Sequence, residues 1–275
     1  MSTLVETHPI ATTYAPERTL SPRPGVRETV DQSLAMAGRS LKKMRRNMEQ
    51  FFDVTIQPLL FTAMFAYIFG GAVSGSVQDY LPVVISGVLA QTALTACMAT
   101  GTQMREDMDK GVFDRFKSLP IARVAPLIGP AIADLLRYAI AATLTIGVGI
   151  AMGYRPSPWG TVAAWVLTVF AGWSLAWIFT WLGTVARSAQ AVQGIGMMIM
   201  FPLTFLSSAY VPASTMPGWL ESFVKVNPVN LVIESLRDLM NDGQVTMHVL
   251  WAVVGCLVVI AVFLPLAVRS YGKKM

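Results

Sequence analysis

The sequence predicts an all-α membrane protein with six transmembrane helices. Of its 275 residues, 54% are hydrophobic and only 13% are charged. This composition is rare in soluble domains and common in multi-span membrane proteins. The apolar residues fall into six stretches, each close to the roughly 17 to 25 residues that a helix needs to cross a bilayer. Lysines and arginines gather near alternate ends of these stretches, which indicates a fixed orientation in the membrane.

The chain begins with a polar segment followed by a basic one. Residues 1–28 are rich in Thr, Pro, Ser and Glu and lack the apolar core of a signal peptide, so we predict a disordered cytoplasmic tail. Residues 29–52 alternate apolar and basic side chains, which predicts an amphipathic helix lying in the membrane interface. A solvated basic helix is the alternative. The basic residues that would face the anionic inner leaflet are Arg39, Lys42, Lys43, Arg45 and Arg46.

Residues 53–270 are predicted to form the six-span transmembrane domain, and residues 271–275 a short cytoplasmic tail. The first span is the least regular, because Gln57 and Pro58 lie near its start. The fourth and fifth spans have no charged residue in their cores. The predicted spans are 54–73, 80–102, 127–152, 160–185, 190–210 and 248–268.

The basic residues near the span ends predict the orientation. With the N-terminus inside, fourteen lysines and arginines flank the cytoplasmic ends of the spans and three flank the outer ends. The opposite orientation would invert this bias, which membrane proteins avoid. We therefore expect a multi-pass protein of the cell membrane with both termini in the cytoplasm.

The longest charged segment between two spans is residues 105–123. Its apolar residues recur at spacings of three and four, which places them on one face of a short helix that Pro120 would end. We expect this helix at the cytoplasmic surface, where a soluble partner can bind it. The apolar residues are Met108, Val112, Phe113, Phe116 and Leu119.

The long outer connection, residues 211–247, holds two apolar runs that are too short to cross a bilayer. They are separated by Asn227 and Pro228. We predict two short helices that dip into the outer leaflet or pack over the membrane domain. Trp219 suits the interface, where amphipathic rings concentrate.

Three polar side chains inside the predicted spans are candidate functional residues. Asp134 and Arg137 are three residues apart near the inner end of the third span, where a local ion pair at the interface is the preferred interpretation and a role in substrate or proton handling the alternative. Gln91 lies deep in the second span. It either contacts substrate in a central cavity or bonds to a neighbouring helix.

The fifth span is rich in methionine and phenylalanine. Methionine is flexible and polarizable and suits surfaces that accept varied apolar ligands. A substrate path is therefore one interpretation of this span, and ordinary lipid-facing packing is the other. The candidate residues are Met197, Met198, Phe201 and Phe205.

The sequence lacks the usual signatures of an enzyme. It has no phosphate-binding G-x-x-x-x-G-K-[ST] motif and no recognisable hydrolase or metalloprotease motif. The two cysteines and two histidines are isolated, so no metal site is expected. We expect no catalysis and no cofactor in this chain, and no nucleic acid as a partner.

Two segments carry a resemblance to a known family. These are DKGVFDRFKSLPIAR at 109–123 and FPLTFLSSAYVPASTMPGWLESFVKVNPVN at 201–230, with YIFGGAVSGSVQDYL at 67–81 in support. Together with the basic helix, the six spans and the long outer segment, they resemble the permease subunits of ABC-2 type exporters, and among these the daunorubicin/doxorubicin-resistance permeases. The likeness covers most of residues 35–270.

The resemblance implies a half-transporter: a permease that pairs with a second permease chain, identical or paralogous, and binds two separate ATPase subunits that carry the ATP and Mg²⁺. It implies that the outer re-entrant element includes Trp219, Asn227 and Pro228. The family's ATPase-facing coupling helix matches Asp109, Lys110, Gly111, Phe113, Asp114, Arg115, Phe116, Leu119 and Pro120.

The substrate class is open at this point. An amphiphilic drug or lipid-like metabolite fits spans made largely of Ala, Val, Leu, Met and Ile. A polysaccharide or glycolipid exporter of the same architecture is the alternative, although a sugar path would call for more aromatic and polar lining. An ion-coupled secondary carrier fits less well, because such carriers place ionisable groups near the midplane.

Overall fold

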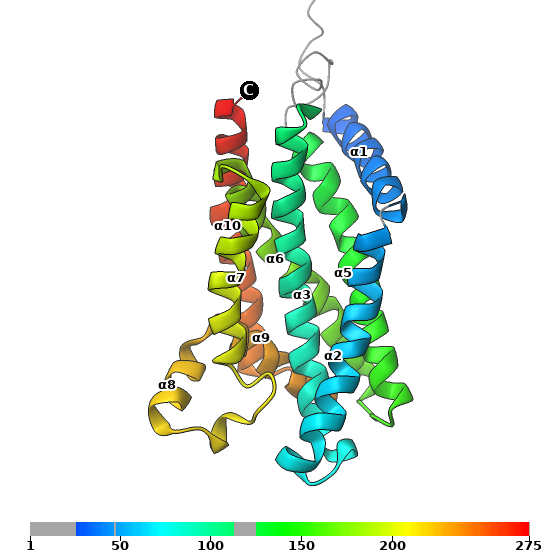
Figure 1. The fold of residues 1–275 in the computed structure, drawn as a ribbon, viewed down its shortest axis with the longest axis vertical. Helices are drawn as coiled ribbons and strands as arrows, with labels where there is room; N and C mark the ends of the chain where they lie inside the picture. Colours follow the sequence, from blue (N-terminus) through cyan, green and yellow to red (C-terminus); the bar gives the residue numbers. More distant parts are fainter. Residues whose placement is uncertain (1–25, 47, 113–124, 275) are drawn as a thin grey trace, which may run out of the picture.

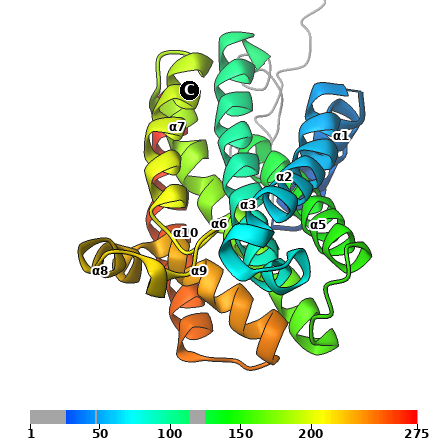
Figure 2. The same ribbon diagram turned by 60° about the horizontal axis from the view of Figure 1, so that its bottom comes forward.

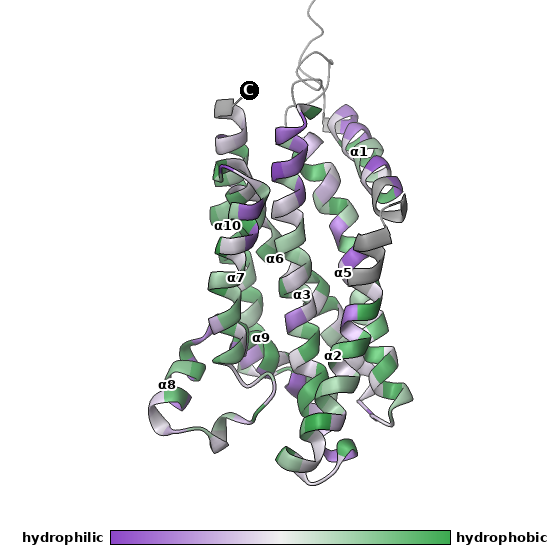
Figure 3. Ribbon diagram, in the orientation of Figure 1, coloured by the Kyte–Doolittle hydropathy of each residue, from purple (hydrophilic) through white to green (hydrophobic). Residues whose placement is uncertain are grey.

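The computed structural model describes residues 26–46, 48–112 and 125–274. Within these residues the regular secondary structure is helical throughout, and the long helices form an elongated bundle (Figure 1). One end of the bundle carries the start of α1, the end of α3 and the C-terminus. We call it the charged end, because hydrophilic residues gather there on α1 and α3 (Figure 3). We call the opposite end, where the short helices α8 and α9 lie, the capped end (Figure 2).

The first two helices divide the chain differently from the prediction. Helix α1 spans Val26–Arg46, so it begins within the predicted tail, with Glu28 in its first turn. Helix α2 spans Met48–Ser74, so the last residues of the predicted interfacial helix lie at the start of α2. The reason is that residues 48–52 are good helix formers that continue directly into the apolar stretch. α1 packs on the start of α5, where a Cβ on Gly129 would lie 2.3 Å from the Cβ of Met36.

Helix α3, Val77–Asp109, is the central element of the bundle (Figure 1). Ser76 caps its N-terminus by accepting a hydrogen bond from the Asp79 N–H at 3.1 Å. The helix contacts α2, α5, α6, α7 and α9. It runs seven residues past the predicted span, so the start of the charged segment is the end of this helix and not a separate element. The i,i+4 pairs Arg105–Asp109 and Glu106–Lys110 explain the extension.

Helices α5 (Ala125–Ala151) and α6 (Pro158–Val185) match the predicted third and fourth spans closely. α6 approaches α3 so closely that the backbones of the two helices are in contact. A Cβ on Gly101 would lie 2.5 Å from the carbonyl oxygen of Phe179, and one on Gly183 would lie 2.5 Å from the carbonyl oxygen of Gly101. Only glycine permits this crossing, so α3 and α6 form a tightly packed pair.

The predicted fifth span is shorter than expected. Helix α7 covers Ala189–Phe205, 17 residues, and ends because Leu206 leaves the helix and Asn227 takes up the last carbonyls. Five of the described helices (α2, α3, α5, α6 and α10) are long and apolar enough to cross a membrane. α7 is a shorter apolar helix, so the count of six spans stays a prediction.

The capped end is built as two short helices, as predicted. Helix α8 spans Gly218–Val226 and helix α9 spans Pro228–Arg237, continued by the π-helical turn Asp238–Asp242. α9 is packed into the bundle against α3, α6, α7 and α10, whereas Trp219 of α8 is 74% exposed.

The last helix, α10, covers Met247–Lys274 and packs along α6. Residues 271–274 of the predicted cytoplasmic tail therefore continue this helix. Tyr271 is buried in a small cluster with Met104 of α3 and Leu127 of α5, and this contact explains the extension. The main apolar core lies nearer the capped end, where α2, α3, α5, α6 and α9 meet.

Candidate functional site

The charged end joins α3 to the turn between α6 and α7. Arg105 donates from Nη1 to the carbonyl oxygen of Ala186 at 2.9 Å and pairs with Asp109 on its own helix. Lys110 Nζ lies 3.1 Å from Glu106 Oε2. Gly111 has a φ of +64°, a left-handed conformation that ends α3.

Three residues of the predicted ATPase contact fall in this described region. Asp109 and Lys110 are exposed and Gly111 is half-buried, directly after the end of α3. The other six residues lie outside the described residues, so their contact role stays a prediction. They are Phe113, Asp114, Arg115, Phe116, Leu119 and Pro120.

The basic residues predicted for an interfacial helix lie at the end of α1. Arg39 and Lys42 are exposed on this helix, whereas the side chains of Lys43, Arg45 and Arg46 lie outside the description. The packed face of α1 is made of small residues, with Ser33 and Ala37 buried. The placement of α1 in the membrane interface stays a prediction.

A polar stripe runs along the half of α3 nearer the charged end. Its residues are half-exposed and recur at helical spacing, whereas Leu94, Cys97 and Gly101 on the opposite side of the helix are buried. The Oε1 atom of Gln91 is buried and has no hydrogen-bond partner among the described residues. We call these residues the polar stripe: Gln91, Thr92, Thr95, Thr102 and Gln103.

Helix α7 lies beside this part of α3. The two helices meet where a Cβ on Gly196 would lie 2.6 Å from Cγ of Met98. The predicted path residues Met197, Met198, Phe201 and Phe205 point elsewhere, with exposed fractions of 50–80%. Phe201 and Phe205 stack with their ring centroids 4.4 Å apart. The structure therefore places Gln91 and these four residues on two helices that pack against each other, with the four side chains on the exposed side of α7.

Asp134 and Arg137 form the predicted ion pair, with Arg137 Nη2 2.9 Å from Asp134 Oδ1. Both side chains are buried within the bundle, with 9% and 4% exposure, and their position near the membrane interface stays a prediction. Arg137 donates to the Ala96 carbonyl oxygen and to Thr100 Oγ1, both at 2.6 Å, and Thr100 donates to Asp134 Oδ2 at 2.7 Å. The pair thus joins α5 to α3. The sequence alone does not reveal this burial between the helices.

The predicted outer element contains a structural asparagine. Asn227 is buried, caps α9 by accepting from the Val229 N–H at 2.9 Å, and donates to the carbonyl oxygens of Leu203 and Leu206 at 2.7 and 2.8 Å. Pro228 occupies the first turn of α9, where its missing N–H is not needed. Trp219 lies on the exposed side of α8. The asparagine therefore ties the end of α7 to the start of α9.

Comparison with known proteins identifies the family. Residues 31–241 match the family described as ABC-2 type transporter. The chain is 35% identical over 254 residues to the daunorubicin resistance ABC transporter permease protein DrrB1 of Streptomyces coeruleorubidus, covering 92% of this chain and 90% of the relative. This chain belongs to the ABC-2 type transporter family. Within it, the chain is a permease similar to the daunorubicin-resistance proteins and a multi-pass membrane protein.

Two further relatives are less similar to this chain. A probable doxorubicin resistance ABC transporter permease protein DrrC of Mycobacterium tuberculosis (strain ATCC 25618 / H37Rv) is 24% identical, over 92% of this chain and 93% of the relative. The probable multidrug ABC transporter permease YbhR of Escherichia coli (strain K12) is 26% identical over 55% of this chain and 41% of the relative. The matched family region extends from α1 to the π-helical turn, so it includes the polar stripe and the capped end.

Sequence reasoning missed several polar residues of this ABC-2 permease. In the polar stripe it found Gln91 alone, although Thr95, Thr102 and Gln103 follow at helical spacing. At the capped end it missed Asn230 and Glu234, which contact the segment between α7 and α8. Their spacing on α9 was a usable signal, but their partner at Ser208 is 22 residues or more away in sequence. Among the described residues no group of three or more His, Cys, Asp and Glu could hold a metal ion.

Proposed function

We propose that this chain is the permease half of an ATP-driven exporter that moves an amphiphilic drug or lipid-like metabolite out of the cell. The observation that supports it best is the half-exposed polar stripe of α3, together with the exposed methionines and phenylalanines of α7, the helix that packs against α3. A second permease chain would complete the path. Two separate ATPase subunits would bind ATP and Mg²⁺ and hydrolyse the nucleotide.

The exposure of the stripe supports a path in this position. Side-chain amides facing lipid are unfavourable, so a half-exposed stripe that contains Gln91 and Gln103 is expected to face water or another protein chain. Gln91 supplies a carbonyl oxygen that has no partner among the described residues. Met197, Met198 and Phe201 supply an adaptable apolar surface. An amphiphile has polar groups that can contact the stripe and apolar groups that can contact the α7 surface, whereas a sugar polymer lacks a large apolar surface for α7.

The length of α3 supports coupling to a partner at the charged end. Its 33 residues span about 50 Å, at about 1.5 Å per residue. A movement imposed on Asp109 and Lys110 therefore reaches the capped end through one helix. The Arg105 bond to Ala186 passes the same movement to the turn before α7. In our proposal the ATPase subunits bind residues 109–120, and nucleotide binding shifts the permease between two states.

The distribution of basic residues supports a cytoplasmic charged end. Fourteen lysines and arginines flank the span ends on that side and three on the other. The ATPase subunits, which need cytoplasmic ATP, would bind there, and export would proceed toward the capped end.

The first experiment is co-purification of the permease with a candidate ATPase subunit, followed by ATPase assays in lipid with and without an anthracycline. A stable complex with stimulated turnover supports a drug exporter. A complex without stimulation directs the substrate search to endogenous amphiphiles. Failure to bind any ATPase subunit, from a set that includes those encoded beside the gene, would contradict the proposal.

A variant with Phe113 and Phe116 both replaced by alanine tests the coupling segment. We expect the protein to reach the membrane and the permease to lose substrate transport while the ATPase keeps turning over. The matched control is F223A, which removes one exposed ring from α8 at the capped end. Normal transport by the F113A/F116A double variant would show that residues 109–120 are not the coupling site.

A further inference from the structure

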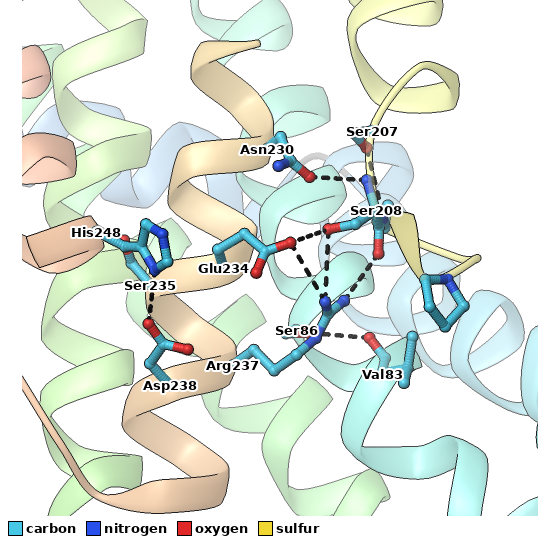
Figure 4. Close-up of polar contacts among 12 residues, drawn as sticks. Val83, Ser86, Ser207, Ser208, Asn230, Glu234, Ser235, Arg237, Asp238 and His248 are labelled. Atoms are coloured by element: carbon cyan, nitrogen blue, oxygen red, sulfur yellow. Dashed lines mark hydrogen bonds and ion pairs between the residues drawn. The ribbon is translucent and has the colours of Figure 1, made fainter. Parts of the chain in front are cut away.

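One serine between α7 and α8 is held by three side chains from a single face of α9 (Figure 4). The Ser208 N–H donates to Asn230 Oδ1 at 2.8 Å, and Ser208 Oγ donates to Glu234 Oε1 at 2.8 Å. Arg237 Nη2 donates to the Ser208 carbonyl oxygen at 2.8 Å. Residues 230, 234 and 237 are spaced by four and three, so they share one face of the helix. We call these three residues the clasp.

The segment that the clasp holds lies across α3. We call residues 206–210 the strap. At Ala209 the strap is so close to α3 that a Cβ on Gly87 would lie 2.0 Å from its carbonyl oxygen. Tyr80 of α3 donates to the Tyr210 carbonyl oxygen at 2.7 Å, and the Tyr210 ring stacks on Phe65 of α2 with centroids 4.1 Å apart. The strap therefore bridges α7, α3 and α2.

The strap lies at one limit of the polar stripe. Gly87 precedes Gln91 by four residues, about one helical turn. On the side of Gly87 toward the capped end, α3 is packed: Leu81, Val84 and Ile85 are fully buried. On the other side the half-exposed stripe begins. A path along the stripe would thus meet the strap at its capped end.

The clasp is built to be released more easily than a core contact. The shortest charged contact, Arg237 Nη1 to Glu234 Oε1, is 3.5 Å, and both side chains keep about a fifth to a quarter of their exposure. Arg237 Nε is buried without a partner among the described residues. Burial lowers the pKa of Arg237 from its ordinary value, opposed by Glu234 and Asp238. Water reaching this site would offer the guanidinium bonds that the closed state leaves unmade.

We propose that the strap is the gate at the capped end of the transport path, and that Asn230, Glu234 and Arg237 are the positioning residues that hold it closed. This rests on the proposed function in taking the polar stripe as the path. Opening requires the strap to leave α9 and Gly87, which frees the three polar groups of Ser208 to face water.

Access to the stripe tests the gate without requiring transport. Q91C is introduced into a C97A/C256A background, and intact cells are treated with a membrane-impermeant thiol reagent. With the clasp intact we expect slow modification of the introduced thiol. With Glu234→Gln and Arg237→Gln together, which leaves no unpaired charge, we expect modification at least tenfold faster. Equal rates in the two backgrounds, or no modification in either, would overturn the proposal.

A cross-link supplies a second test that does not depend on the folding of the clasp variant. S208C/N230C should form a disulfide under mild oxidation and block transport, with reductant restoring it. The matched control is D238C/H248C, since Asp238 Oδ2 and His248 Nδ1 are 2.8 Å apart and tie the π-helical turn after α9 to α10, away from the strap (Figure 4). This control should cross-link and keep transport.

The outcomes separate the two proposals. Transport by the cross-linked S208C/N230C protein, or its failure to cross-link when the control does, would overturn the gate. If no tested amphiphile is transported at all, the proposed function fails, but the labelling rates still decide whether the clasp closes the stripe.

Discussion

The same local motif occurs twice in this permease, in two different settings. In each, an acidic residue precedes an arginine by three positions: Asp134 and Arg137 on α5, and Glu234 and Arg237 on α9. In each, the arginine donates to a backbone carbonyl of another element, Ala96 in one case and Ser208 in the other, at 2.6 and 2.8 Å. In each, a hydroxyl from that element donates to the acid.

The two settings differ in burial and in geometry. The Asp134–Arg137 pair is 2.9 Å apart with at most 9% exposure and joins two long helices. The Glu234–Arg237 pair is 3.5 Å apart with 27% and 19% exposure and holds the strap. If the Asp134–Arg137 pair is broken, the remaining charge stays buried and unsolvated. If the Glu234–Arg237 pair is broken, the remaining charge is partly exposed to solvent. The comparison indicates that one motif serves as a permanent lock in the core and as a releasable clasp at the capped end.

The largest expected effect breaks the lock. Arg137→Met leaves Asp134 buried without its cation, so we expect a loss of about 3–5 kcal/mol in the free energy of unfolding. The loss is measured by thermal unfolding in detergent and by the amount of protein in the membrane. The control is the Asp134→Leu/Arg137→Met double variant, which removes both charges and should recover most of the loss. If the single variant is as stable as the parent, the pair is not a lock.

The next effect tests the packing beside each pair. Gly101→Ala would place a Cβ 2.5 Å from the Phe179 carbonyl oxygen on α6, a neighbour that cannot yield, so we expect a loss of about 1–3 kcal/mol. Gly87→Ala would meet the Ala209 carbonyl oxygen at 2.0 Å, but there the strap can move away. We expect a smaller loss of stability and faster labelling of the thiol in Q91C.

Gly147→Ala serves as the control for both glycines. Nothing lies within 4 Å of a Cβ at that position, which is also inside a transmembrane helix. We expect a change within about 1 kcal/mol, in the stabilising direction, because alanine favours the helix. Equal losses from G101A and G87A would mean that the strap is as fixed as the core.

A smaller effect sharpens the role of the clasp. Arg237→Lys keeps the positive charge but loses the planar fork that reaches both the backbone and the side chain of Ser208. We expect a loss of about 1 kcal/mol, the range of one net hydrogen bond, together with clearly faster labelling in Q91C. Unchanged labelling with the same loss of stability would assign Arg237 a structural role alone.

The class of fold could be predicted from the sequence because the lipid bilayer requires long apolar helices. Apolar stretches of membrane length and the bias of basic residues need no tertiary information. It failed where the ends of helices depend on contacts. α3 continues to Asp109 through side-chain pairs, α7 stops at Phe205 because Asn227 takes its last carbonyls, and α10 continues because Tyr271 is buried.

The site was predictable to a smaller degree, for a related reason. Gln91 stood out as the one strong polar group in its span, but the threonines of the stripe did not. Threonine is common in transmembrane helices, because its hydroxyl can bond to a carbonyl of its own helix, as Thr95 does to Gln91. Asp134 and Arg137 were predicted to pair, yet their burial depends on Thr100, 34 residues away. The clasp depends on the folded position of the strap, which has no signature in the composition.

The smallest effect sets the baseline for both arginine pairs. Lys225 and Glu221 on α8 form an ion pair at 2.8 Å, shorter than that of the clasp, but with 71% and 37% exposure and, within the described part of the chain, no bond to another element. Lys225→Ala should therefore change the free energy of unfolding by less than about 0.5 kcal/mol and leave labelling in Q91C unchanged. Thermal unfolding and the labelling rate are measured beside those of Arg137→Met and Arg237→Lys. If Lys225→Ala has an effect as large as Arg237→Lys, then the distance between charges, and not the bond to the backbone of another element, decides what such a pair contributes.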